Sequence, residues 1–163
     1  MSDARWATAD LCDAHPNVVH PVLAVFHDFG GVRKFHGPIA TLRVDEDYRP
    51  VLRELEREGR GRVLVVDGGG SLHRAILGER LLHTAARNGW AGVVVNGAVR
   101  DTAQTREVPI GLRALGVVPQ RGESGEPDHV DQPLTFAGAT FAPGEWLWAD
   151  ADGIVVGPAV DGA

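Results

Sequence analysis

The sequence predicts a mixed α/β fold, with a β-sandwich or barrel-like core and helices packed on it. Two apolar runs, at 62–66 and 92–96, flank a helical pattern at 78–88, which is the order of a β-α-β unit. The chain after residue 122 instead contains short strand-like runs separated by Gly and Pro. We therefore expect a parallel unit covered by helices, with a meander of short strands packed against it.

The N-terminal part predicts one short helix, then strands and a longer helix. The short helix is expected at Thr8–Ala14, because Thr8 or Asp10 can cap its start and Pro16 follows its end. The other elements expected here are strands at 22–26 and 37–44 and an amphipathic helix at 48–58.

The middle of the chain predicts the β-α-β unit itself. The run 62–66 is apolar enough for a central strand, and the helix 78–88 ends at Gly89. The strand 92–96 completes the unit, since the connection is long enough for a parallel crossover. The remaining elements expected are a short helix at 110–115 and strands at 117–118, 134–136, 139–141, 146–148 and 154–156.

Length, charge and cysteine content narrow the class of protein. The chain has 163 residues, which fits a single domain over 1–163, and its net charge is −6. This acidic balance argues against direct nucleic-acid binding, which needs a basic face. The single Cys12 fits a reducing compartment, no apolar run has membrane-spanning length, and no signal-peptide pattern is present. We therefore expect a cytoplasmic protein without a membrane partner.

The strand 92–96 leads into Gly97, which is followed after two residues by Arg100 and Asp101. A guanidinium can bind a substrate carboxylate through two hydrogen bonds, and a carboxylate is a hard oxygen ligand for a divalent cation. The pair therefore indicates a site for an anionic, oxygen-rich small molecule held together with a metal. An ordinary structural ion pair is the alternative, because neighbouring Arg and Asp are common.

A second part of this site is expected at the start of the helix 78–88. Its first turn has unpaired amides and a partial positive charge, which can hold a carboxylate. In a β-α-β unit the helix start and the end of the next strand can share one end of the sheet. Glu79 could then converge with Arg100 and Asp101, although a first-turn carboxylate that interacts only with the helix dipole is the alternative.

The triple glycine at 68–70 does not indicate a nucleotide site. The spacing G-x-G-x-x-G is missing, and no Gly-Lys-Ser/Thr follows. Two interpretations remain, a loop that needs unusual backbone angles and a loop that lines the pocket.

Short motifs are spread over nearly the whole chain. They are Thr8-Ala9-Asp10-Leu11-Cys12-Asp13-Ala14, Phe29-Gly30-Gly31, Phe35-His36-Gly37-Pro38-Ile39-Ala40-Thr41, the segment 61–71, Leu77-Gly78-Glu79, Asn88-Gly89-Trp90-Ala91-Gly92, Asn96-Gly97-Ala98-Val99-Arg100-Asp101 and the segment 149–154. In these motifs the chain resembles the RraA-like proteins, which makes 1–163 a single RraA-like domain. This family includes regulators of ribonuclease E activity and class II 4-hydroxy-4-methyl-2-oxoglutarate aldolases, and some members were once labelled menaquinone-pathway methyltransferases.

The resemblance implies a swivelling β/β/α-type fold in a ring-shaped homotrimer. It also implies that Arg100 clamps the keto-acid substrate and that Asp101 holds the metal. The substrate carboxylate would lie on the helix start formed by Gly78, Glu79, Arg80 and Leu81. Glu79 stands where the family's aldolases have Asp; it keeps the charge but reaches one methylene further, and we assign it an acid/base role.

The implied function is a lyase that uses a divalent cation, Mg²⁺ or Mn²⁺, to release pyruvate from 4-hydroxy-4-methyl-2-oxoglutarate. Decarboxylation of oxaloacetate passes through the same pyruvate enolate, so one site could do both. Lys34 is the only lysine and lies outside these motifs, which makes a Schiff base less suitable than a metal. The alternative is a non-catalytic regulator that inhibits a ribonuclease E-type enzyme through its surface.

Overall fold

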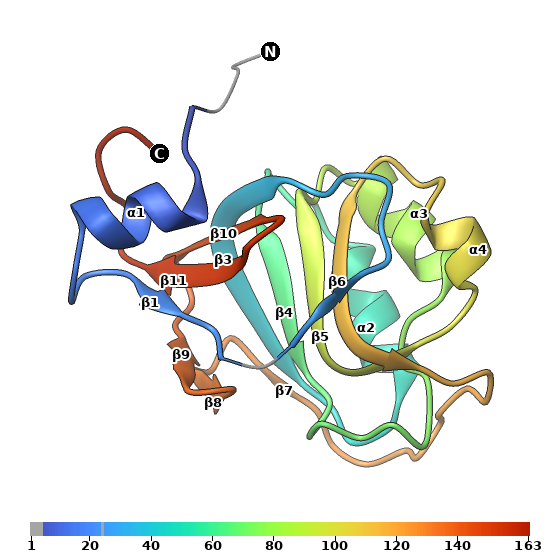
Figure 1. The fold of residues 1–163 in the computed structure, drawn as a ribbon. Helices are drawn as coiled ribbons and strands as arrows, with labels where there is room; N and C mark the ends of the chain where they lie inside the picture. The colour runs from blue at the N-terminus through green and yellow to red at the C-terminus, as the bar shows by residue number, and fades with distance from the viewer. Residues whose placement is uncertain (1–4, 24) are drawn as a thin grey trace.

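The computed structural model of this chain describes residues 5–23 and 25–163 (Figure 1). Four parallel strands form its centre, in the order β3-β4-β5-β6. Their bounds are β3 (Phe35–Arg43), β4 (Val63–Asp67), β5 (Gly92–Val99) and β6 (Gly111–Val117). The predicted β-α-β unit is present, because β4 and β5 pair in parallel and α3 (Glu79–Arg87) lies between them in sequence.

Antiparallel strands extend this sheet on both sides and curl it. The long strand β3 pairs with β10 through its first residues and with β4 through its last ones, so it belongs to both parts of the sheet. The full order is β1-β11-β10-β3-β4-β5-β6-β2, with β7 beside the end of β3 and β8 and β9 forming a separate hairpin. Their bounds are β1 (His20–Pro21), β2 (His27–Asp28), β7 (His129–Val130), β8 (Leu134–Phe136), β9 (Ala139–Phe141), β10 (Trp146–Asp150) and β11 (Gly153–Gly157).

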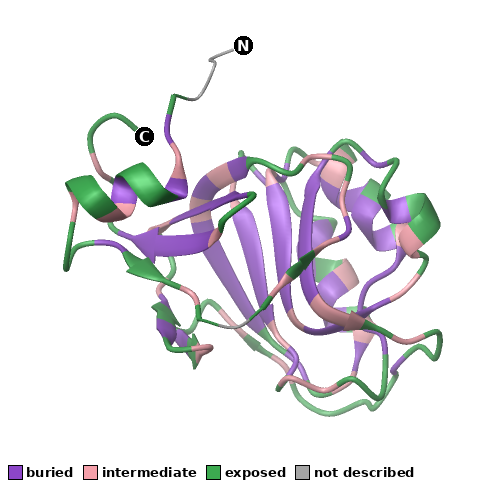
Figure 2. Cartoon of the chain, viewed as in Figure 1, coloured by how far each residue is buried: buried purple, intermediate pink, exposed green. Residues whose placement is uncertain are grey.

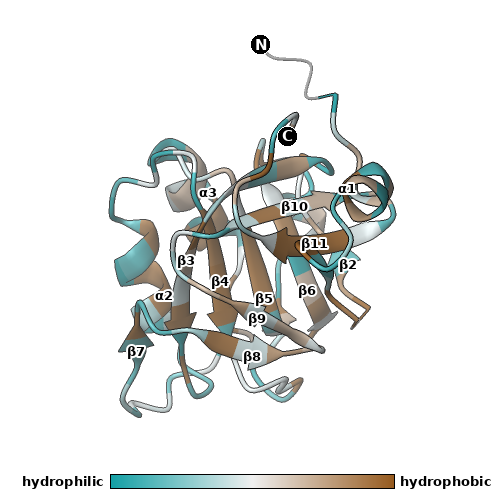
Figure 3. Ribbon diagram, turned by 90° about the vertical axis from the view of Figure 1, so that its left-hand side faces the viewer, coloured by the Kyte–Doolittle hydropathy of each residue, from teal (hydrophilic) through white to brown (hydrophobic). Residues whose placement is uncertain are grey.

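Side chains of the central strands are buried on both faces (Figure 2). On β4, Leu64 and Val66 belong to the cluster beneath the helices, whereas Val63 and Val65 pack toward β8–β11. A strand covered on both faces needs an unbroken apolar run, which is the pattern seen in the sequence. The hydropathy colouring of Figure 3 agrees, since β4 and β5 are apolar over most of their length.

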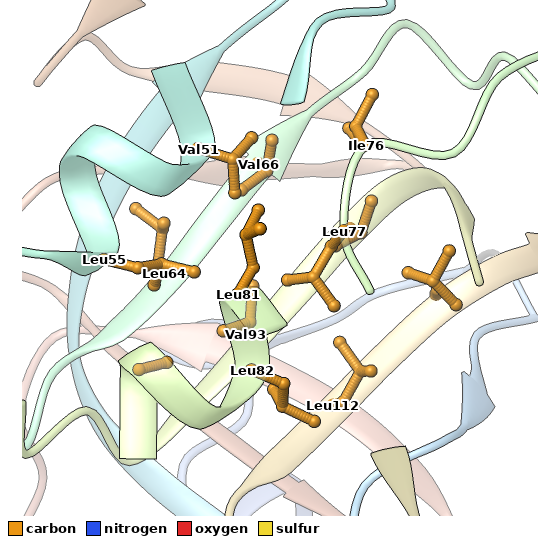
Figure 4. Close-up of a cluster of buried hydrophobic side chains, with 14 of the residues drawn as sticks. Val51, Leu55, Leu64, Val66, Ile76, Leu77, Leu81, Leu82, Val93 and Leu112 are labelled. Atoms are coloured by element: carbon orange, nitrogen blue, oxygen red, sulfur yellow. The ribbon is translucent and has the colours of Figure 1, made fainter. Parts of the chain in front are cut away.

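Two helices cover the face of the sheet that carries Leu64 and Val66. They are α2 (Tyr48–Leu55) and α3, which contact each other. Figure 4 shows their apolar side chains meeting those of the strands, with Val51 and Leu55 from α2 and Leu81 and Leu82 from α3. The α/β class with a barrel-like, curled sheet and flanking helices is therefore confirmed.

Two predicted elements are wrong. The helix expected at 110–115 is the strand β6, which pairs with β5 and buries Leu112 and Ala114 toward the helices. The strand expected at 22–26 is replaced by β1 and β2, which lie at opposite ends of the sheet order. The chain between them crosses from one edge to the other, so it finds no continuous partner strand; Ala24 lies outside the described residues.

The strand expected at 117–118 does not form a separate element, because Val117 is the last residue of β6. The other expected elements are present, several of them with shifted ends. The first helix, α1 (Thr8–Ala14), has the bounds that the sequence predicts, and α2 ends three residues earlier than expected, at Leu55 rather than 58. The sequence did not predict α4 (Thr102–Thr105) or β7. Among the described residues, no helix combines the length and the apolar character that crossing a membrane requires.

Asp47 ties the start of α2 to the loop after β6. Its buried carboxylate accepts hydrogen bonds from the Arg49 amide and guanidinium and from the Gly125 amide at 2.8 Å. The Arg49 hydrogen bonds are the main reason that the pKa of Asp47 falls from 3.8 to about 2. The charged form is thus favoured in the folded state.

We predict that Asp47→Asn lowers the free energy of unfolding by about 2 kcal/mol at pH 7. The folded pKa lies below the unfolded one, so this stabilisation is complete above about pH 4 and is lost as the pH falls toward about 2. Urea unfolding of both proteins at pH 7 and pH 2 measures it. Asp128→Asn, which removes an exposed partner of Arg53, is the control. A difference between wild type and Asp47→Asn that persists at pH 2 would contradict the assignment.

Candidate active site

The predicted Arg-Asp pair lies where β5 ends and beside the start of α3. The chain that precedes α3 runs along the last residues of β5, because the Ile76 amide donates to the Ala98 carbonyl at 3.0 Å. The Arg100 amide then donates to the Leu77 carbonyl at 2.9 Å. These two backbone bonds bring the helix start against the pair that follows the strand.

Gly78 and Asp101 meet at close range. One oxygen of Asp101, Oδ2, accepts a hydrogen bond from the Glu79 amide at 3.1 Å. A Cβ atom at Gly78 would lie only 2.5 Å from that oxygen, so this approach requires glycine. Asp101 itself has φ +60°, a left-handed conformation that costs energy in a residue with a side chain and is common at functional sites.

A small pocket of about 50 Å³ lies over this contact. Its apolar part belongs to the protein core, since Leu77 and Leu81 are members of the buried cluster of Figure 4. Its polar part is dominated by cations. The lining residues are Tyr48, Ala75, Leu77, Gly78, Arg80, Leu81, Arg100, Asp101 and Arg121.

Five of the six residues predicted for the site line this one pocket: Gly78, Arg80, Leu81, Arg100 and Asp101. The sixth, Glu79, contributes its backbone amide but not its carboxylate. That carboxylate lies 3.7 Å from Nε2 of His83, one helical turn along α3, and is about half exposed. The structure therefore groups the predicted residues, but it turns the Glu79 side chain along the helix surface.

Four lining residues were missed: the apolar Ala75 and Leu77, and two with polar groups, Tyr48 and Arg121. Tyr48 is the first residue of α2, and Arg121 lies in the loop after β6. The Tyr48 amide donates to the Gly122 carbonyl at 3.1 Å, and the guanidinium of Arg121 lies 4.5 Å from the centre of the Tyr48 ring. Neither residue belongs to a motif, and no local sequence pattern joins them to Arg100.

The donor set around Asp101 fits one kind of metal site. Among residues 5–23 and 25–163, no group of three or more His, Cys, Asp and Glu side chains is placed to hold an ion. Asp101 is the single carboxylate in the pocket lining. Mg²⁺ is commonly bound by one or two carboxylates together with water and substrate oxygens, so one aspartate beside a substrate pocket suits it, whereas a closed zinc site would need more ligands.

The triple-glycine loop has a structural role: its backbone folds back onto the strand β5. Gly69 and Gly70 have positive φ angles, and the amides of Gly68 and Gly70 both donate to the carbonyl of Asn96 on β5 at 3.0 Å. None of these glycines lines the pocket. Of the two interpretations, the one that requires unusual backbone angles is therefore the better supported.

Comparison with known proteins identifies the family to which a chain with this site belongs. The family model described as RraA-like, Aldolase/RraA, matches residues 8–156. A relative from Azotobacter vinelandii named "Putative 4-hydroxy-4-methyl-2-oxoglutarate aldolase" is 45% identical over 154 residues, with 94% of this chain and 95% of the relative covered. A relative of the same name from Burkholderia mallei is 46% identical and covers 93% and 94% of the two chains.

Solved structures with the same fold are named for other activities. The S-adenosylmethionine:2-dimethylmenaquinone methyltransferase from Geobacillus kaustophilus has a TM-score of 0.92 at 41% identity, covering 96% of this chain and 97% of that one. The RNA-processing inhibitor RraA from Thermus thermophilis has a TM-score of 0.90 at 48% identity, covering 94% and 93%. The resemblance found in the sequence is thus confirmed: this chain belongs to the RraA-like family.

Proposed function

We propose that the chain is a divalent-metal-dependent lyase that cleaves 4-hydroxy-4-methyl-2-oxoglutarate to pyruvate, with oxaloacetate decarboxylation as a second activity of the same site. The observation that carries the proposal is the single pocket shared by Arg100, Asp101 and the first turn of α3. The names of the aldolase relatives support the same reaction.

In the retro-aldol reaction the C3–C4 bond breaks, and its electron pair stays with C3, which becomes part of the enolate of one pyruvate. The 4-hydroxyl loses its proton, C3 gains one, and the substrate yields two molecules of pyruvate. Arg100 would bind the keto-acid end and stabilise the negative charge that develops on it. The first-turn amides of Arg80 and Leu81 have no acceptor within the helix, so they are suited to the carboxylate next to the keto group.

Asp101 would hold the divalent cation, through the carboxylate oxygen that does not accept from the Glu79 amide. The cation would supply electrophilic stabilisation of the charge that develops on the keto oxygen. The Glu79 amide holds one oxygen of this carboxylate, and the close contact with Gly78 limits the space around it. A carboxylate held in this way needs little reorganisation to bind a cation.

Proton transfer is assigned to Glu79, acting through water. Its carboxylate is about half exposed on the first turn of α3, and its backbone is bonded to Asp101. A charged group at that position can exchange protons with solvent, and it would reach a bound substrate through water once its side chain turns from His83 toward the pocket.

The first prediction concerns the metal. Metal-stripped protein in excess chelator should lose turnover, and Mg²⁺ or Mn²⁺ should restore it. Asp101→Asn should lower kcat/KM by roughly 100-fold or more, because a neutral amide is a poor ligand for a hard cation. Asn tolerates the left-handed backbone, so the fold should be kept. Asp128→Asn is the control, and full turnover of the stripped wild type would remove the metal from the mechanism.

The second prediction concerns Arg100. Arg100→Lys keeps the charge but loses the planar fork, which should cost about 2–4 kcal/mol of transition-state stabilisation. Inhibition by oxalate, which mimics the pyruvate enolate, should weaken in parallel. Arg87→Lys, at the last residue of α3, serves as the control. If kcat/KM and oxalate inhibition both stay at the wild-type level, Arg100 does not clamp the substrate.

The third prediction concerns Glu79. Glu79→Gln should lower kcat by roughly 10²-fold or more while the binding of oxalate is preserved, because the backbone amide stays in place. His83→Gln removes the neighbour of the Glu79 carboxylate and should change kcat only slightly. A Glu79→Gln protein with wild-type kcat would exclude Glu79 as the acid/base group.

A protein-binding regulator of a ribonuclease E-type enzyme is the second candidate. It is favoured by the RraA from Thermus thermophilis, named an RNA-processing inhibitor, at 48% identity. Its test is whether the purified chain slows RNA cleavage by such an enzyme. Asp101→Asn would separate the two functions, since loss of lyase activity should leave a surface-based inhibition unchanged. The homotrimer implied by the resemblance remains a prediction for either function.

A further inference from the structure

We infer that Arg121 binds the far carboxylate of the substrate, which makes this pocket selective for 2-keto acids that carry a second negative charge. The inference rests on the proposed function, because it assumes that the keto-acid end lies against Arg100. It adds a specificity-determining residue that comes from a different part of the chain, the loop after β6.

The pocket lining has more positive than negative side chains, which favours a ligand with more than one anionic group. Three arginines line it, Arg80, Arg100 and Arg121, against the single carboxylate of Asp101. A cation held by Asp101 would increase the positive excess further. One substrate carboxylate pairs with one guanidinium, whereas a dicarboxylate provides a second negative group, which can compete with Glu123 for Arg121.

The position of Arg121 fits the second group. A wider, open groove adjoins the pocket and is lined by Arg100, Pro119, Gln120, Arg121 and Glu123. Arg100 and Arg121 are the two residues that line both spaces. A ligand bound to Arg100 at one end and extending toward the groove would therefore pass Arg121.

The backbone that carries Arg121 is fixed on both sides. The Ala75 amide donates to the Gln120 carbonyl at 2.7 Å, and the Gly122 amide donates to the Ala75 carbonyl at 3.0 Å. The next residue is packed so tightly that a Cβ at Gly122 would lie 2.2 Å from the Glu46 carbonyl oxygen. Because this backbone is already held in place, it loses little conformational entropy when the Arg121 side chain binds a ligand, which favours binding.

The guanidinium is also oriented before any ligand arrives. It lies over the ring of Tyr48 and forms an ion pair with Glu123, and the two side chains of this pair are 41% and 43% exposed. A pair this exposed contributes little to stability, so its partner can be exchanged at low cost. A substrate carboxylate would replace Glu123 on Arg121, or share the guanidinium with it.

Binding of two stable ligands tests the inference without turnover. 2-Oxoglutarate and 2-oxopentanoate have the same carbon chain, but the second ends in a methyl group instead of a carboxylate. Both lack the 4-hydroxyl and cannot undergo the retro-aldol step. Calorimetric titrations with Mg²⁺ present should give the wild type a roughly tenfold lower Kd for 2-oxoglutarate, which is the typical contribution of one partly exposed charged hydrogen bond.

Arg121→Gln should remove this preference, bringing the two Kd values within about twofold, and should leave the Kd of 2-oxopentanoate unchanged. Arg53→Gln is the matched control, because Arg53 also forms an exposed ion pair with a carboxylate, Asp128, but lies outside the pocket. The inference is overturned if Arg121→Gln retains the preference, if it weakens both ligands equally, or if the wild type has no preference.

Turnover separates this inference from the proposed function. 4-Hydroxy-4-methyl-2-oxopentanoate has a methyl group in place of the far carboxylate and would yield pyruvate and acetone. Arg121→Gln should lower kcat/KM roughly tenfold for the dicarboxylate substrate and leave that of the monocarboxylate nearly unchanged. A wild type that cleaves neither substrate overturns the lyase proposal, while the binding preference, if observed, still assigns Arg121 to the far carboxylate.

Discussion

The central parallel strands are buried on both faces, and this burial determines where the helices and the remaining strands can lie. Neighbouring parallel strands must be joined by crossovers, and here α2 and α3 supply the cover for one face while the strands β8–β11 cover the other. Because β4 and β5 are parallel, both strands end at the same edge of the sheet. The chain that follows β4 leads into α3, so α3 begins next to the place where β5 ends. The candidate site is a consequence of this arrangement.

The pocket combines an apolar part inherited from the core with polar groups at the ends of regular elements. Leu77 and Leu81 are held by packing, and the backbone bonds around Arg100 hold its main chain in register with them. Rigid placement of this kind suits a site that must stabilise charge developing on a substrate, because the groups do not need to reorganise. Asp101 has a left-handed backbone conformation, and its carboxylate is held by the Glu79 amide.

The family includes proteins named for different activities on one fold. A shared fold does not fix the chemistry, and it is the side chains in the pocket that favour a lyase. An inhibitor that works through its surface has no need for three guanidinium groups and a fixed carboxylate around an apolar pocket. The cationic lining is in this respect more informative than the names of the relatives.

Local sequence patterns were sufficient to predict the parallel unit, the two amphipathic helices and the meeting of Arg100 and Asp101 with the start of α3. Each depends on local periodicity or on a short motif, and each was confirmed in outline by the described residues. The pattern of apolar residues could specify these elements because both faces of the sheet are covered.

Other features of the fold and of the pocket depend on contacts between distant parts of the chain. Residues 111–117 form a strand, because pairing with β5 outweighs their local preference, and 22–26 connect two opposite edges of the sheet. Tyr48 and Arg121 enter the pocket through hydrogen bonds and ring contacts between segments far apart in the chain. Local periodicity contains no information on such pairings, since their free energy comes from contacts that exist only once the chain has folded.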